Sequence, residues 1–404
     1  MDAAFSFYNE PHFKSFSMND LAVKVGISKP AIYRHYKDKD AVIAAMYEQF
    51  VDMLATCLLK VQEEADQNKT VSVPTFASLI QFFAEHPYYI NYMMGNMCAQ
   101  DDFEKQIVIE MTKRGVKDLV GYGILGYGDT DATIKDMWQY VRGIYCGVTI
   151  FIFIKLREKW VQQGEKAESL AVFSENVVRA ITGGFKTIAP ADHILHPAEI
   201  SEKRFAQLDA LCTIGDDVLP PENRIFTALA KTIVKYKFTG VTVDKIAAEL
   251  NMAKSSLYEY FDNKNQMIKS LIVRELTLMT TIIKENSAEA HNFSEYLYIL
   301  LRTELSYFTL RPSIIPVCGW LLQSTTDDPF AGDFDATNQW VEKLPDPLVP
   351  FSFGMAVHPQ QFLAWVSSLP VALVVQGANR SLDGQTLLQA LKMIFQFLEY
   401  GTDR

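Results

Sequence analysis

The pattern of apolar and polar positions predicts a short amphipathic helix near the start of the chain. Met18, Leu21, Ala22 and Val25 follow the i, i+3, i+4, i+7 spacing that places side chains on one helix face. Ser17 precedes them at the N-cap position, where its side-chain oxygen can accept from the first turn. We therefore expect a helix that begins directly after Ser17 and buries this face.

A second helix is expected directly after the first. Gly26 ends the first helix, at a position that favours the left-handed conformation. Ser28 then caps a second helix with Pro30 in its first turn, where a missing N–H costs nothing. Two short helices joined by a Gly-containing turn form the helix-turn-helix arrangement. The outer face of the second helix would carry side chains suited to phosphates and base edges, namely Lys29, Tyr33, Arg34 and His35.

The same pattern occurs again 225 positions later, where residues 242–264 match residues 17–39. Apolar and motif positions agree over roughly eighty residues, which is typical of an internal repeat. Three of the matched pairs are Lys29 with Lys254, Tyr33 with Tyr258, and Lys39 with Lys264. The chain is therefore expected to be a tandem duplication of one helical architecture.

These residues resemble the DNA-binding domain of the TetR family. The run GISKPAIYRHYKDK at 26–39 looks like the second half of that domain, and residues 3–8 with Phe13 look like its first helix and exit. The resemblance implies an all-α fold, in which each copy has a three-helix DNA-binding domain and a helical domain for effector binding and dimerisation. It also implies that the two copies form an intramolecular pseudo-dimer.

The first copy departs from the family pattern at its start. Met1 aligns with Phe226, so we expect the opening turn of the first helix, and any basic arm before it, to be absent. Pro11 and His12 stand where the family usually has a turn that ends in Gly.

The duplication divides the chain into five expected segments. DNA-binding domains are expected at 1–45 and 222–270, helical effector and dimerisation domains at 46–190 and 271–404, and a linker at 191–221. Within the linker, residues 198–212 favour a helix, so a partly ordered linker is expected. Each copy should close with two apolar helices, at about 134–160 and 167–188 and at about 359–377 and 384–400. In the family, such helices form a four-helix interface between protomers. The stretch 325–359 is expected to be a long irregular loop.

The resemblance assigns DNA contacts to both copies. Ser17 and Thr242 would offer a hydroxyl and the amides of a helix N-terminus to a phosphate, and Lys39 and Lys264 would reach phosphate from the next helix. The full expected set is Ser17, Lys29, Pro30, Ala31, Tyr33, Arg34, His35, Lys39, Thr242, Lys254, Ser255, Ser256, Tyr258, Glu259, Tyr260 and Lys264. In the alternative interpretation, Tyr33 and Tyr258 are partly core and the lysines are merely solvated.

The two copies differ where bases would be read. Arg34 aligns with Glu259, and His35 aligns with Tyr260. Arginine suits a phosphate or a guanine edge, whereas glutamate can only accept, for instance from a cytosine amino group. We therefore expect an asymmetric operator whose two halves differ in sequence. The alternative is that the second copy binds DNA only non-specifically.

Aromatic and thioether side chains are dense in the helical domains. Such stripes are core more often than pocket, but the family resemblance implies that at least one half encloses a mostly apolar cavity for a small apolar or aromatic effector. The residues expected to line it are Tyr89, Met93, Trp138, Tyr145, Trp320 and Trp365.

The net charge and the cysteine content indicate how the protein meets DNA and in which compartment it works. The formal net charge is −10, although residues 1–50 and 222–272 together carry fourteen Lys/Arg and eleven Asp/Glu. An acidic body weakens non-specific association with DNA, which leaves affinity to a few local contacts. The five cysteines are scattered without a CxxC pair, which indicates a reduced cytoplasmic protein.

The remaining signals favour no membrane segment, no metal and no catalysis. No charged-then-apolar leader begins the sequence, and the most apolar run, 143–154, is shorter than the ~18 residues that span a bilayer. His193 and His196 form an H-x-x-H without further ligands, so neither a metal nor a cofactor is expected. Nucleotide-binding, zinc-protease and nucleophile-elbow motifs are missing, so the chain is expected to be non-enzymatic.

Together, these features predict a cytoplasmic transcriptional regulator, a ligand-responsive repressor that binds a double-stranded DNA operator with two half-sites. Two recognition helices held about one DNA turn apart, ~34–36 Å, secure contacts that one helix cannot. The alternative is an architectural or nucleoid-associated DNA-binding protein without a small-molecule inducer.

Overall fold

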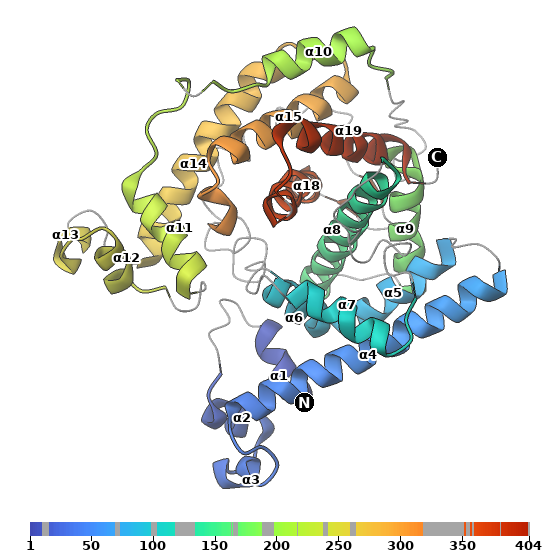
Figure 1. Ribbon diagram of the computed structural model, residues 1–404, viewed down its shortest axis with the longest axis vertical. Coiled ribbons are helices and arrows are strands. Elements are labelled where there is room, and N and C mark those ends of the chain that lie inside the picture. The colour runs from blue at the N-terminus through green and yellow to red at the C-terminus, as the bar shows by residue number, and fades with distance from the viewer. Residues whose placement is uncertain are drawn as a thin grey trace.

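The computed structural model describes most of the chain as helices (Figure 1). The described residues are 1–9, 16–68, 73–97, 103–117, 134–162, 164, 169–187, 198–215, 217–236, 241–258, 264–317, 351–352, 356–357, 359–379 and 381–402. Several sequence predictions fall outside them: Phe13, His193, His196, Glu259, Tyr260 and Trp320.

The first half begins with α1 (Asp2–Phe5) and a 3-10 helix η1 (Ser6–Asn9). The helix-turn-helix follows as α2 (Met18–Val25) and α3 (Lys29–Tyr33). The body consists of α4 (Lys39–Asn68), α5 (Val73–Glu85), α6 (Pro87–Met97), α7 (Phe103–Lys113), α8 (Ile134–Gln162), α9 (Leu170–Gly183) and the 3-10 helix η2 (Phe185–Thr187).

The second half follows a connecting helix, α10 (Glu202–Leu211). Its N-terminal unit contains α11 (Arg224–Tyr236), α12 (Val243–Glu249) and α13 (Lys254–Tyr258). Its body contains α14 (Lys264–Ser287), α15 (Phe293–Leu310), α18 (Pro359–Asn379) and α19 (Gly384–Tyr400). The antiparallel strands β1 (Phe351–Ser352) and β2 (Ala356–Val357) form a small hairpin before α18.

The spacing of the repeat extends through the structure. Equivalent helices begin 225 positions apart at Met18 and Val243, Lys29 and Lys254, Lys39 and Lys264, and Ile134 and Pro359. The spacing therefore holds as far as α8 and α18, whereas α9 and α19 begin at Leu170 and Gly384 and depart from it.

Two expectations from the sequence need correction. Residues 3–8 were expected to form one helix, but the chain tightens from α-helix to 3-10 helix at Ser6. The stretch 325–359 was expected to be irregular, and most of it lies outside the described residues. Its residues 351–352 and 356–357 instead form the antiparallel strands β1 and β2, in which Phe351 pairs with Val357. The all-α prediction is confirmed for the remaining described elements.

An aromatic cluster joins the N-terminal helix α1 to the body of the first half. The ring of Phe5 on α1 lies 4.9 Å from that of Tyr89 and 5.2 Å from that of Tyr92, both on α6. Phe50 of α4 lies 5.2 Å from Tyr92. Edge-to-face aromatic pairs of this kind stabilise beyond the area they bury. Helix α1 is therefore fixed to α4 and α6 rather than only to α2.

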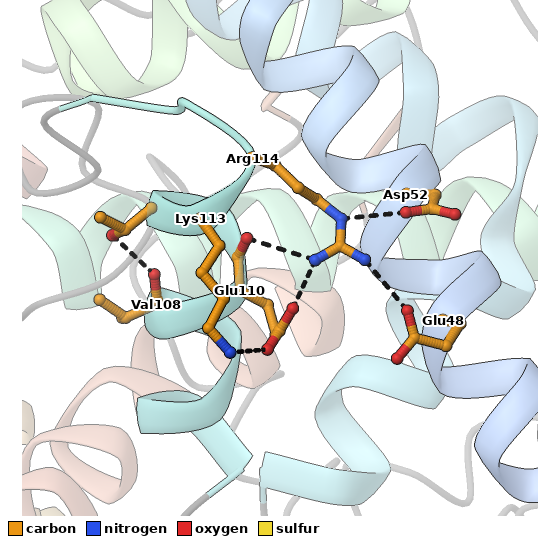
Figure 2. Close-up of polar contacts among 7 residues, drawn as sticks. Glu48, Asp52, Val108, Glu110, Lys113 and Arg114 are labelled. Atoms are coloured by element: carbon orange, nitrogen blue, oxygen red, sulfur yellow. Dashed lines mark hydrogen bonds and ion pairs between the residues drawn. The ribbon is translucent and has the colours of Figure 1, made fainter.

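A single arginine ties α7 to α4 (Figure 2). Arg114 follows α7 and donates to Asp52 at 2.9 Å and to Glu48 at 3.0 Å, both on α4. It also pairs with Glu110 one turn earlier, and the hydrogen bonds to Asp52 and Glu110 raise the pKa of Arg114. Glu48 and Asp52 are more than half exposed, so the cluster orients α7 more than it stabilises the fold.

The closing helices of both halves pack together at the centre of the molecule, where α8 contacts α18 and α19, and α19 contacts α9 (Figure 1). Trp365 of α18 is buried and its indole N–H donates to the Thr149 hydroxyl of α8 at 3.0 Å. The Trp365 ring also lies 5.1 Å from Phe153. These helices therefore pack on one another, and their role as a four-helix interface of a pseudo-dimer stays a prediction.

Two glycines let the ends of α9 and α19 approach closely. Gly184 and Gly401 have φ values of +64° and +81°, in the left-handed region. A Cβ on Gly184 would lie 2.6 Å from the carbonyl oxygen of Leu398, and a Cβ on Gly401 would overlap the backbone of Thr182. The Thr402 N–H then donates to the Ile181 carbonyl at 3.0 Å. The ends of α9 and α19 are thus joined backbone to backbone.

The helix expected within the linker is present and packs on the second half. Arg204 of α10 donates to both carboxylate oxygens of Glu295 on α15, at 3.1 and 2.8 Å. Ser201 caps α10 by accepting from the Arg204 amide. Because Glu295 is buried, this bidentate pair fixes α10 against α15.

Two helical segments, Lys39–Glu63 and Met137–Glu158, are long and apolar enough to cross a membrane. The second one contains the apolar run 143–154, so the helix is longer than that run alone indicated. Of the most apolar windows, 39% and 67% are buried against other parts of the molecule. Core helices of soluble proteins have the same character, so this signal is weak.

Candidate DNA-binding surface

The first helix of this helix-turn-helix, α2, is capped at its N-terminus by a reciprocal pair of hydrogen bonds. The Asp20 amide donates to the Ser17 hydroxyl at 3.1 Å, and the Ser17 amide donates to the Asp20 carboxylate at 2.8 Å. This is a capping box, and its hydrogen bonds lower the pKa of Asp20. The Ser17 N–H is therefore already used, while its hydroxyl proton can still reach a phosphate.

The turn between the two helices has the same geometry in both copies. Gly26 takes a φ of +74°, and Asn251, at the equivalent position, takes +53°. The following amides close the turn in the same way, from Ile27 to Ala22 at 3.0 Å and from Met252 to Ala247 at 2.9 Å. Asparagine tolerates the left-handed conformation better than most non-glycine residues. The second copy therefore retains the turn without glycine.

The second unit begins with a simpler cap. The Thr242 hydroxyl accepts from the Lys245 amide at 3.3 Å, and the third helical position holds this lysine instead of an acid. The Lys245 ammonium lies 4.1 Å from the ring centre of Tyr236 on α11. The predicted cap residues Ser17 and Thr242 thus occupy equivalent positions but differ in their partners.

The first recognition helix, α3, presents its predicted contact residues to solvent. Ile32 is buried and anchors the helix, whereas Lys29, Pro30, Arg34 and His35 are exposed and Ala31 is half-buried. Tyr33 is 45% exposed, and the Lys29 ammonium lies 5.9 Å from the centre of its ring. Tyr33 is thus neither buried in the core nor fully exposed, and its role in DNA contact stays a prediction.

The second recognition helix, α13, has the same division of faces. Leu257 is buried, Lys254 and Ser255 are exposed, and Ser256 is half-buried. Tyr258 is 46% exposed, nearly the same fraction as its counterpart Tyr33. The described part of α13 therefore presents a surface like that of α3.

Both units lie at the edge of the molecule, away from the central interface, with α3 at the bottom and α13 at the left of Figure 1. Lys39 begins α4, and its ammonium lies 5.4 Å from the centre of the Phe16 ring. Asp38 caps α4 by accepting from the Ala41 amide at 2.8 Å. Lys264 begins α14 at the equivalent place, but its side chain lies outside the described residues.

The sequence did not predict the ion pair between Asp244 and Lys254 on this surface. Asp244 accepts a hydrogen bond and ion pair from Lys254 at 2.8 Å, which joins α12 to α13. The pair lowers the pKa of Asp244 and raises the pKa of Lys254. In the sequence, the two copies differ in charge at this position, because the residue equivalent to Asp244 in the first copy is the uncharged Asn19.

The residues expected around a ligand lie in two different places. Tyr89 is buried and accepts from the Gln49 amide at 2.9 Å, and Met93 on the same helix is half-buried. The other described members lie between the two halves: Trp138 and Tyr145 have ring centres 5.8 and 5.5 Å from that of Phe397, and Trp365 contacts Thr149. Their role in effector binding stays a prediction.

Comparison with known families supports the DNA-binding units. The model of the bacterial regulatory proteins of the TetR family matches this chain twice, at residues 1–46 and 225–271. These segments contain the helix-turn-helix α2–α3 and its equivalent α12–α13.

Two curated relatives are similar to part of the chain. The HTH-type transcriptional regulator SAR2658 of Staphylococcus aureus (strain MRSA252) is 26% identical over 85 residues, which are 21% of this chain and 46% of that protein. The uncharacterized HTH-type transcriptional regulator YvaF of Bacillus subtilis (strain 168) is 34% identical over 59 residues, 15% of this chain and 29% of that protein. The chain thus spans less than half the length of either relative. The matches show that two segments of this chain are similar to the DNA-binding region of TetR-family regulators.

Proposed function

We propose that this chain is a non-enzymatic, ligand-responsive transcriptional repressor of the cytoplasm, in which two TetR-like units are fused and read one operator together. The observation that carries the proposal is the pairing of two capped helix-turn-helix units with one shared four-helix interface. A lone recognition helix makes too few specific contacts, whereas two in successive major grooves make enough.

Fusion gives the two units a fixed stoichiometry. Tethered partners meet at an effective concentration near the millimolar range, so assembly does not depend on the amount of protein in the cell. The reciprocal approach of Gly184 and Gly401 and the Trp365–Thr149 hydrogen bond support this intramolecular pairing. The same fusion lets the two units diverge, as the alignment of Arg34 with Glu259 indicates.

The operator test begins with selection of duplexes from a random pool by the full chain. We expect an asymmetric site, protection of two regions about one helical turn apart, and one chain of 45.8 kDa per duplex in light scattering. A strict palindrome bound by two chains, each through one unit, would contradict the fused reader. Selection of no sequence above the random pool would favour the architectural alternative.

Effector binding in the helical body would change the spacing of the recognition helices as a shift between two populated states. The aromatic contacts from Phe5 to Tyr89 and Tyr92 support a mechanical link from the body to the first unit. We expect a small apolar or aromatic compound to release the selected operator. A broad library of such compounds that leaves operator release unchanged would argue for a regulator without an inducer.

A further inference from the structure

The second DNA-binding unit carries an ion pair on the surface assigned to DNA. Lys254 is the first residue of α13, and its ammonium lies 2.8 Å from the Asp244 carboxylate on α12. The two side chains are 48% and 65% exposed, so both remain accessible to a large ligand. A lysine in this position offers one positive charge to a phosphate, and here a carboxylate already lies against it.

The first unit lacks this carboxylate. Asn19 occupies the position equivalent to Asp244, 225 residues earlier, and Lys29 is the equivalent of Lys254. The Lys29 ammonium lies over the ring of Tyr33, which leaves its charge uncompensated by an acid at the equivalent place. The same lysine therefore has two different electrostatic settings in the two units.

The two helix-turn-helix motifs also differ in net charge over their full length. Residues 17–39 carry five Lys/Arg and two Asp/Glu, whereas residues 242–264 carry three and four. Their formal net charges are thus +3 and −1. Because each neutralised phosphate releases counterions, the first motif should attract DNA more strongly and depend more steeply on salt.

We propose that the two units are unequal DNA readers, and that Asp244 restrains Lys254 so that the second unit binds phosphate weakly. The first unit would supply most of the affinity, and the second would bind once the first has positioned the chain. Exposed ion pairs are weak, so Lys254 can exchange Asp244 for a phosphate, but the carboxylate stays near and repels that phosphate. This inference rests on the proposed DNA-binding function.

The test uses the full chain and the duplex that the wild-type protein selects from a random pool. Asp244→Asn should tighten binding by about five-fold at 100 mM salt and steepen the slope of log K against log salt by about one. Asn19→Asp should do the reverse in the first unit, weakening binding by a similar factor. Glu249→Gln is the matched control, because it removes one negative charge from the far end of α12, and it should change binding less than two-fold.

The outcomes separate this inference from the function on which it rests. If the wild-type chain binds the duplex and Asp244→Asn behaves like Glu249→Gln, the restraint by Asp244 is refuted while DNA binding stands. If Asn19→Asp also leaves binding unchanged, the inequality of the two units is refuted as well. If the wild-type chain binds no duplex even at 50 mM salt, the proposed function and this inference are overturned together. Thermal unfolding of each variant shows that the comparison is made on folded protein.

Discussion

Replacement of Gly401 by alanine should weaken the joint between the two halves. Gly401 follows α19 with a φ of +81°, and an added Cβ would overlap the carbonyl group of Thr182 at the end of α9. The three atoms nearest to the added Cβ all belong to the backbone of Thr182 and Gly183, so no side-chain rotation relieves the overlap. The two helix ends must separate, which breaks the hydrogen bond from Thr402 to Ile181.

The size of the effect follows from three contributions. A non-glycine residue in the left-handed region costs about 1–2 kcal/mol. Loss of the Thr402 hydrogen bond costs about 1 kcal/mol, and overpacking adds about 1–3 kcal/mol. We therefore expect Gly401→Ala to lower the free energy of unfolding by about 3–6 kcal/mol.

Gly115→Ala is the matched control. Gly115 has a similar φ of +86°, but a Cβ there meets no atom within 4 Å. This variant should therefore show only the conformational cost of about 1–2 kcal/mol. Urea unfolding followed by far-ultraviolet circular dichroism measures both. Equal losses for the two variants would refute the close approach of the two halves at Gly401.

Three further results are expected. Ser17→Ala removes the capping box and should cost about 1 kcal/mol, measured by thermal unfolding, with faster amide exchange in α2 than in the wild type. Burial raises the pKa of Glu304 from its usual 4.5 to about 8. The contribution of this carboxyl group to the free energy of unfolding is therefore fully present below pH 4.5 and is lost as the pH rises through 8. Glu304→Gln should remove up to about 1.4 kcal/mol per pH unit of that dependence in urea titrations between pH 5 and 8, and a slope equal to that of the wild type would contradict it. Trp365→Phe and Thr149→Val should each destabilise, and their double-mutant cycle should give a coupling of about 1 kcal/mol, whereas additive losses would show that the hydrogen bond between the halves contributes nothing.

The sequence predicted the features that depend on local signals. The Ser17 cap, the left-handed Gly26 and the start of α19 at Gly384 were all placed correctly, because caps and periodicity are encoded within a few residues. The end of α1 was not, since its change to a 3-10 helix at Ser6 has no such local signal.

Contacts between distant residues could not be predicted in the same way. Trp365 belongs to an aromatic stripe, but periodicity does not tell whether such a face meets its own half or the other one. The approach of Gly184 to Gly401 depends on where two helix ends meet across 217 positions of sequence. Asp244 and Lys254 lie closer together in sequence than these residues do. Aligning Asp244 with Asn19 reveals that only the second copy has an acid near this lysine.

The attachment of α10 to α15 changes where this chain can be divided. Arg204 of α10 reaches Glu295, and the Ser294 hydroxyl accepts from the amide of Ala198. A fragment that starts at residue 222 would therefore leave the Glu295 carboxylate without its guanidinium and uncover the side of α15 that α10 protects. The second half would keep its fold only if residues 198–221 stay with it. The segment between the two halves is in this way a structural part of the second one, so a cut that frees the second half has to fall before residue 198.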